Sequence, residues 1–279
     1  MSLDTPAPGA VLQYERRGPF WFARFNRADK RNALSEDLVE ALGLLCDAVG
    51  ADLEARALVL WGAGGHFCAG ADFGRFLELM AAEPGPGVDP IVTHNRAFGA
   101  LLERLAGLSV PTIAVVRGAA MGGGCGLAAV ADRVIAADDA TFAMPEVTLG
   151  VAPAQIAPFV VRRLGATRAR WMMLQAGRLD AQAALAAGLA DEVVPVSGLV
   201  AAVRDTLAAL AVADPAALRA TKRIVQRADQ LALPDALDDA AREFAGLLRH
   251  GAAREGIAAT RERRAPRWRV ELPDLPEFT

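Results

Sequence analysis

Apolar residues follow two patterns along the first half of this chain. Short apolar runs bounded by glycine, proline or charged residues predict strands, and they lie at residues 11–26 (two strands around an Arg-Gly turn), 56–62, 111–118, 133–138 and 140–146. Between these runs, apolar residues recur at helical spacing. Strands that alternate with helices in this way predict an α/β fold with a largely parallel sheet.

The first predicted helix begins after Ser35, a residue type that caps helix N-termini. Glu36 and Asp37 follow, and carboxylates in a first turn interact favourably with the helix dipole. The apolar face of this helix comprises Leu38, Leu42, Leu45 and Val49. A second helical pattern covers residues 93–108.

After Pro153 the pattern becomes predominantly helical. Helices are expected at residues 155–164, 166–176, 180–187, 199–213, 215–227, 234–249 and 254–264, with one short strand within 189–195. We therefore expect a mixed core over residues 1–195 and a helical region over residues 196–279. The Pro/Gly-rich stretch at 81–90 is either a loop that borders a binding site or a simple surface connection.

Composition narrows the class of protein. The chain has 279 residues, 53% of them hydrophobic, which is enough for a substantial core, and a net charge of −3 gives no sign of nucleic-acid binding. Charged residues interrupt the longest apolar runs, so we expect no membrane span. The N-terminal residues show no secretory signal pattern. Three cysteines, without a CxxC pair, argue against a disulfide framework or a metal site, and a cytoplasmic location is expected.

Two segments share an unusual design, in which a buried strand ends, glycines follow and a helix begins. They are residues 60–73 and 115–128, the second with the run Gly122–Gly124. The first N–H groups of a helix lack internal partners, and glycine lets a ligand approach them closely. Two such groups can converge on one oxygen as an oxyanion hole, where one donor contributes about 3–4 kcal/mol to transition-state stabilisation. The alternative is that these glycines only permit tight helix–strand packing.

Other glycine motifs fit less well. Phe67 stands where a dinucleotide fingerprint needs its last glycine, and no Lys-Ser/Thr pair follows Gly126 as a P-loop requires.

At these residues the sequence resembles the enoyl-CoA hydratase/isomerase family, also called the crotonase family. Five motifs occur in the family's order between about Val11 and Trp268. They are NRADKRNALS (26–35), GAGGHFCAGADF (62–73), the long segment from VRGAAMGGGCG to MPEVTLGVAP (116–153), GRLDAQAALAAGLADEVVP (177–195) and REGIAATRERRAPRW (254–268).

The resemblance implies a spiral core of repeated strand-strand-helix units with a helical C-terminal region. Residues 1–195 would hold the CoA and catalytic site, and residues 196–279 would mediate assembly into trimers or pairs of trimers. The substrate would be an acyl-CoA thioester of fatty acid metabolism, so CoA arrives as part of the substrate and no separate cofactor or metal is expected.

The family pattern also assigns roles to individual residues. The N–H groups of Ala71 and Gly123 would hold the thioester oxygen and stabilise an enolate. Glu146 would be the catalytic carboxylate, whereas Gly126 stands where family hydratases commonly carry a first glutamate. Substrate and CoA contacts are expected at Arg31, Ala33, Ala69, Gly70, Asp72, Phe73, Gly122 and Lys222.

A single carboxylate leaves the reaction open. Hydration is the first hypothesis, and residues 154–158 resemble a subgroup that hydrates branched glutaconyl-type thioesters. A 3,2-enoyl-CoA isomerase is the second, because one glutamate can carry a proton between C2 and C4. The third is a CoA-thioester-binding protein without catalytic activity.

Other chemistry-bearing residues have simpler interpretations. His66 is expected in a structural or solvent-facing role, and Asp72 in bracing its helix as an alternative to substrate contact. Cys68 and Cys125 are expected to be small buried residues. Asp132 and its neighbour Arg133 are expected in packing or ion pairs at the start of a strand.

Overall fold

The computed structural model describes residues 6–7, 9–81, 87–228 and 230–279. Part of the Pro/Gly-rich stretch, residues 82–86, lies outside the described residues, so its proximity to a binding site stays a prediction.

The described strands are β1 (Leu12–Arg17), β2 (Phe20–Phe25), β3 (Ala57–Gly62), β4 (Thr112–Val116), β5 (Ala119–Met121), β6 (Arg133–Ala137), β7 (Thr141–Ala143), β8 (Arg178–Asp180) and β9 (Glu192–Val194). The described α-helices are α1 (Glu36–Ala51), α2 (Phe73–Ala81), α3 (Pro90–Gly107), α4 (Gly123–Ala129), α5 (Ala157–Leu164), α6 (Ala166–Leu174), α7 (Ala181–Ala187), α8 (Leu199–Ala211), α9 (Pro215–Ala228), α10 (Leu233–His250) and α11 (Ala253–Glu262). Short 3₁₀ helices cover Ala28–Lys30, Glu146–Leu149 and Val196–Gly198.

The main sheet has the strand order β1-β2-β3-β4-β6-β9, and a smaller sheet has the order β5-β7-β8. β1 and β2 form an antiparallel hairpin, whereas the other neighbours in the main sheet run parallel. This confirms the predicted α/β class. The strand β5 was not expected, because its three residues lie inside the glycine-rich segment and carry no alternating pattern of their own.

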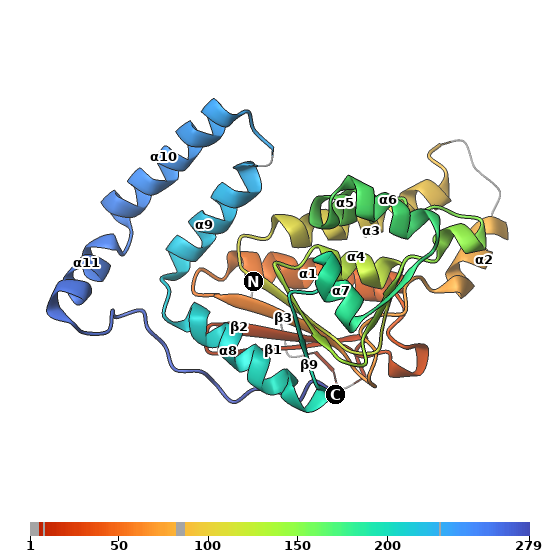
Figure 1. Cartoon of the computed structure of the whole chain (residues 1–279), viewed down its shortest axis with the longest axis horizontal. Helices are drawn as coiled ribbons and strands as arrows, with labels where there is room; N and C mark the ends of the chain where they lie inside the picture. Colours follow the sequence, from red (N-terminus) through yellow and green to blue (C-terminus); the bar gives the residue numbers. More distant parts are fainter. Residues whose placement is uncertain (1–5, 8, 82–86, 229) are drawn as a thin grey trace.

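Alternate residues of the central strands enter two different cores, which explains why these strands are apolar throughout. On β3, Leu58 and Leu60 join the core beneath α1, α3 and α4, and Val59 and Trp61 join the core on the opposite face. Helices therefore cover both faces of the sheet (Figure 1).

The region after residue 196 contributes to the core as well as forming a separate arm. α8 packs on the second face of the sheet, and the last residues return to the same core, where the ring of Phe278 packs edge-on against Trp61 with centroids 5.3 Å apart. The arm consists of α9, α10 and α11 (cyan to blue in Figure 1). α9 contacts the rest of the chain through Arg219 and Lys222, whereas α10 and α11 stand away from the sheet and α10 buries no residue.

Among the described helices, no single one is long and apolar enough to cross a membrane. The bent pair Val196–Ala211 and Pro215–Ala228 passes that test of length and composition only when taken together.

Candidate active site at the N-terminus of helix α4

The three glycines at 122–124 sit where β5 turns into α4, and each has a different task. Gly122 is the N-cap residue with φ of 50° and ψ of −116°, a backbone conformation that favours glycine. A Cβ on Gly124 would lie within 3.0 Å of the Cys68 carbonyl oxygen, so this residue permits tight packing. A Cβ on Gly123 would meet Leu34 Cδ1 at 2.5 Å. Packing thus accounts for Gly124, but not for the conformation of Gly122.

The two predicted oxyanion donors lie on adjoining segments. Gly70 has φ of 92°, and a Cβ there would lie 2.8 Å from Met121 O and 3.8 Å from Gly122 Cα. The segment before α2 therefore runs directly beside the turn that precedes α4.

The N–H groups of Ala71 and Gly123 are among those without a hydrogen-bond partner at this junction in the described part of the chain. Leu34 N–H donates to Gly70 O over 2.8 Å, and Asp72 N–H donates to Leu34 O over 3.3 Å, which leaves the N–H between them unused. Gly123 is the first residue of α4, where an N–H has no partner within the helix. In the described part of the chain, neither N–H donates to another group. Both remain available to a ligand oxygen.

Glu146 brings a carboxylate to the same turn. Its Oε1 lies 2.9 Å from the point where a Cβ on Gly122 would stand. Its Oε2 is buried, and among the described residues it has no hydrogen-bond partner. Burial raises the pKa of this carboxyl group above its ordinary value of 4.5, although a hydrogen bond from its own backbone N–H opposes the shift.

The position of the absent first glutamate is filled by apolar side chains. A Cβ on Gly126 would lie within 3.0 Å of Ile156 Cγ2 and 3.7 Å from Leu102 Cδ1. Both of these residues are buried. No second carboxylate replaces the missing one here, and Ile156 closes the space.

The predicted CoA-lining residues come together along one edge of this junction. Ala69 N–H donates to Arg31 O over 2.9 Å, and Ala33 O accepts a hydrogen bond from Arg27. Arg31 is exposed, and no acidic side chain in the described part of the chain pairs with its guanidinium. This cation is therefore free to meet a phosphate.

Asp72 braces the start of α2. It accepts from Arg27 Nη2 over 3.0 Å and from Gly74 N–H over 3.2 Å, and the Arg27 guanidinium lowers the pKa of this carboxyl group. Phe73, the first residue of α2, is exposed. The bracing role expected for Asp72 is what the geometry shows.

Lys222 is placed differently from the expectation. Its Nζ donates to Asp132 Oδ2 over 2.5 Å and to Val110 O over 2.9 Å, and its side chain is 9% exposed. Burial lowers the pKa of this amine, against the attraction of Asp132. In this conformation the amine is an internal bridge from α9 to Val110, just before β4, and to Asp132, just before β6, and its contact with CoA stays a prediction.

Several other residues hold the site in shape. His66 Nδ1 accepts the Ala119 N–H over 3.1 Å, which is the structural role expected for it. Cys68 and Cys125 are buried, and burial raises the pKa of each thiol to about 12. Asn32 was not singled out from the sequence, yet its buried amide donates to Ala63 O and His66 O over 2.9 and 2.7 Å. Its place within the NRADKRNALS motif was the available signal.

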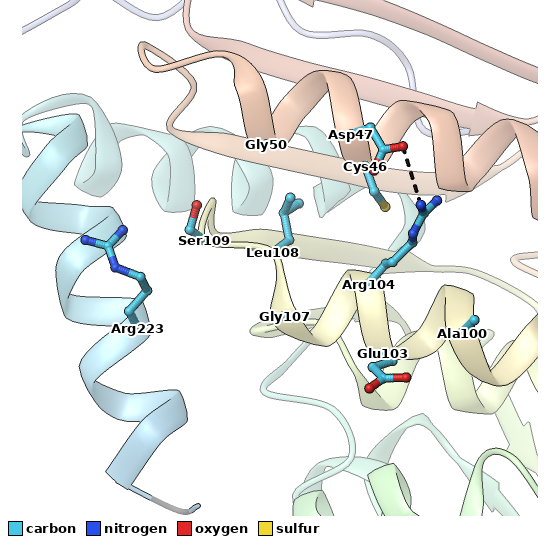
Figure 2. A pocket seen from close by; sticks show the side chains of 10 residues that line it. All are labelled: Cys46, Asp47, Gly50, Ala100, Glu103, Arg104, Gly107, Leu108, Ser109 and Arg223. Atoms are coloured by element: carbon cyan, nitrogen blue, oxygen red, sulfur yellow. Dashed lines mark ion pairs between the residues drawn. The ribbon is translucent and has the colours of Figure 1, made fainter. Parts of the chain in front are cut away.

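A separate depression lies between α1, α3 and α9 (Figure 2). Its volume is about 580 Å³, and its lining includes Cys46, Arg104, Ser109 and Arg223. Arg104 pairs with Asp47 across it at 3.6 Å. None of the predicted catalytic residues lines this depression, so it is not the candidate active site.

The chain is similar to proteins of one known family. Residues 21–271 match the profile of the enoyl-CoA hydratase/isomerase family. The chain belongs to this family. The crystal structure of an enoyl-CoA hydratase/isomerase from Marinobacter aquaeolei matches with a TM-score of 0.90 and 40% identity, covering 93% of this chain and 99% of that one. The AtuE protein of Pseudomonas aeruginosa matches with a TM-score of 0.89 and 41% identity, covering 93% and 100%. The 2,3-dehydroadipyl-CoA hydratase of Escherichia coli is 32% identical over 242 residues, which are 86% of this chain and 91% of the relative.

These matches confirm the crotonase fold and acyl-CoA processing by an enzyme of this family. They leave the choice between lyase and isomerase, and the acyl chain itself, to the chemistry of the site.

Proposed function

We propose that this enzyme hydrates 2-enoyl-CoA thioesters, with Glu146 as its only catalytic carboxylate. The observation that carries this proposal is the unpartnered, buried Oε2 of Glu146 beside the turn at Gly122. A buried carboxylate oxygen without a hydrogen-bond partner costs folding free energy, and such groups gather at functional sites.

The chemistry needs one carboxylate and two N–H donors. The N–H groups of Ala71 and Gly123 hold the thioester oxygen and stabilise the negative charge that develops there. The carboxylate of Glu146 takes a proton from water as the water oxygen forms its bond to C3. The electron pair of the C2–C3 double bond moves to the enolate, and the protonated Glu146 returns the proton to C2. The raised pKa of Glu146 makes its carboxylate a stronger base for the first of these two proton transfers.

The apolar wall at Gly126 and Ile156 points to a substrate that assists its own activation. Without a second carboxylate to orient the water, a branched glutaconyl-type thioester, whose acyl chain is further conjugated or charged, is the better substrate. The name of the Escherichia coli relative, a 2,3-dehydroadipyl-CoA hydratase, supports a thioester with a distal carboxylate.

The same apolar wall also favours the second candidate, a 3,2-enoyl-CoA isomerase. In that reaction Glu146 removes a proton from C2 and returns it to C4, and no water enters. A binding protein without turnover is the remaining alternative.

Binding of the substrate involves CoA as its carrier, with no further cofactor or metal. Arg31 is assigned to a phosphate of CoA, and Ala33, Ala69, Gly70, Asp72, Phe73 and Gly122 to the walls of the site. We also propose a cytoplasmic location, which the three free cysteines support.

We assign assembly to the arm. On α10, exposed apolar side chains recur at helical spacing, at Leu233, Leu237, Phe244 and Leu248. Such a face is covered by another copy of the chain in a trimer or a pair of trimers. Light scattering that gives a monomeric mass at micromolar concentration would overturn this assignment.

Mass spectrometry of the products tests the reaction. The purified protein is incubated with a straight 2-enoyl-CoA, a 3-enoyl-CoA and a branched glutaconyl-type CoA, in heavy-oxygen water and in deuterated water. Gain of one water on a conjugated thioester establishes the hydratase. Conversion of the 3-enoyl compound without gain of water establishes the isomerase. If none of the three thioesters is converted but CoA still binds, the protein is a CoA-thioester-binding protein without catalytic activity.

A further inference from the structure

Two amide side chains meet between α3 and the segment that leads into α5. Gln155 Nε2 donates to Asn95 Oδ1 over 2.8 Å, and both residues are half-buried. Gly99, four residues after Asn95, makes the contact possible, because a Cβ there would lie within 3.0 Å of Gln155 Oε1. The amide pair is therefore tightly packed between α3 and the segment that leads into α5.

Helix α3 places this pair beside the reaction centre. The ring of Phe98 reaches to 3.1 Å from the point where a Cβ on Gly123 would stand. Asn95 lies three residues before Phe98 on the same face of α3, so it is about one turn, or 5 Å, further along the helix.

Gln155 is itself next to the site in the chain. Ile156, which fills the space at Gly126, directly follows Gln155 in the chain. The amide pair thus adjoins the apolar wall of the site on two independent elements. An acyl chain that followed this wall from the thioester would run toward Asn95 and Gln155.

The pair has unused hydrogen-bonding capacity. A primary amide offers two donors and an acceptor with two lone pairs, and the bond between Asn95 and Gln155 uses one donor and one acceptor. Within the described residues, neither side-chain amide has another partner. Three N–H donors therefore remain on the two half-buried side chains.

A cation stands beside the pair. Arg96 Nη1 lies 3.2 Å from the same point on Gly99 that Gln155 Oε1 approaches. The guanidinium pairs with Glu103 at 2.8 Å and keeps further N–H donors free. Amide donors next to a guanidinium match a carboxylate better than a hydrocarbon tail.

We infer that Asn95 and Gln155, assisted by Arg96, bind a carboxylate at the distal end of the acyl chain and so select dicarboxylic acyl-CoA thioesters. This inference rests on the proposed function for the position of the thioester, and it deepens the proposal by naming the residues that read the acyl chain. The two residues bind substrate without touching the reacting atoms.

Binding of saturated thioesters tests the inference without any turnover. Calorimetry compares adipyl-CoA with hexanoyl-CoA, which have the same chain length and differ only in the terminal carboxylate. The wild-type protein is expected to bind adipyl-CoA about tenfold or more tightly, as charged hydrogen bonds of this kind allow. Asn95→Leu and Gln155→Leu are expected to bring the ratio of the two affinities to about one.

Two further variants separate recognition from folding. Asn95→Asp keeps the shape of the side chain and places a like charge against the carboxylate, so it is expected to reverse the preference. Gln182→Leu makes the same chemical change on the exposed face of α7 and is expected to keep the wild-type ratio.

The outcomes keep the two proposals apart. Equal affinity of the wild-type protein for both thioesters, or a preference that survives in the Asn95 and Gln155 variants, overturns the inference. A clear preference for adipyl-CoA without hydration of 2,3-dehydroadipyl-CoA or 2-hexenoyl-CoA supports the inference and counts against the hydratase.

Discussion

Ile156 occupies the space into which any side chain at Gly126 would have to grow. A Cβ on Gly126 would stand within 3.0 Å of Ile156 Cγ2, and both residues are buried. The lack of a first glutamate is thus matched by the packing around it. The single carboxylate of this site therefore depends on the packing around α4 as well as on the residue type at position 126.

The first prediction concerns this packing. Gly126→Glu alone is expected to lower the free energy of unfolding by about 2 kcal/mol or more, because it overfills the core and buries an unpaired carboxylate. Gly126→Glu combined with Ile156→Ala is expected to recover part of that loss, since the smaller residue makes room. Thermal unfolding of these two variants and of Ile156→Ala alone measures the coupling. Gly107→Glu, at an exposed glycine with no neighbour within 4 Å, is the control. Additive effects of the two substitutions would contradict the argument.

The second prediction concerns Glu146. Glu146→Gln is expected to reduce kcat by roughly 10²–10⁴-fold, the usual contribution of general acid–base catalysis, while CoA-thioester binding is retained. Turnover equal to the parent would remove Glu146 from the mechanism.

The pH dependence of the same residue has a definite sign. Burial raises the pKa of Glu146 in the folded state above the unfolded value of 4.5. Between these two pKa values the folded protein binds more protons than the unfolded chain, so this group makes stability fall as pH rises through the window. Below pH 4.5 the penalty is absent. Glu146→Gln should therefore raise the Tm at neutral pH and lose that advantage in acid. The activity of the parent should fall as pH drops through the raised pKa, because the ionised carboxylate is the base. A Tm difference that is independent of pH would show that the buried charge carries no penalty.

The third prediction concerns the turn before α4. Gly122→Ala is expected to lower the free energy of unfolding by about 1–3 kcal/mol, because φ of 50° with ψ of −116° strains an alanine. The added Cβ would stand 2.9 Å from Glu146 Oε1, so the substitution is also expected to displace this carboxylate. Gly188→Ala, with φ of 84° and open space around it, carries backbone strain alone. We expect both variants to lose stability and only the first to lose most of its kcat. Similar kcat values in both would show that the contact with Glu146 is unimportant.

The fourth prediction concerns Arg31. Arg31→Ala is expected to raise KM for CoA thioesters several-fold at low salt and to leave kcat nearly unchanged, as loss of uniform binding does. High salt should weaken the difference, because the guanidinium is exposed. Steady-state kinetics at two ionic strengths measures both effects. An unchanged KM at low salt would place the phosphate elsewhere.

The fifth prediction separates Lys222 from substrate binding. Lys222→Met is expected to lower the free energy of unfolding by about 1–3 kcal/mol, because it removes the bridge to Asp132 and Val110. The loss stays below that of a fully buried pair, since the Asp132 side chain is 41% exposed. Arg223→Met, at a half-exposed arginine of the same helix paired with Glu243, should cost less. A raised KM with unchanged stability would instead support the contact with CoA that the sequence suggested.

The sequence by itself determined most elements of this protein and the order in which they follow, although not the short strands β5 and β8. The apolar run at 57–62 is a strand buried on both faces, Ser35 caps α1 through Leu38 N–H, and the motifs of residues 26–153 identify the family. These signals are readable because strand and helix periodicity, caps and glycine-rich turns act within a few residues of the chain.

Only the tertiary structure decided which groups meet. Lys222 and Asp132 are 90 residues apart in the chain, and the partner that takes up the lysine amine depends on how α9 docks. The segments that carry Ala71 and Gly123 adjoin because β5, which no local pattern predicts, brings Met121 against Gly70. The fit of Gln155 against Gly99 likewise depends on the distance between α3 and the turn that leads into α5. Sequence patterns report which face of an element is apolar, whereas the position of one element against another is set by the packing of the whole core.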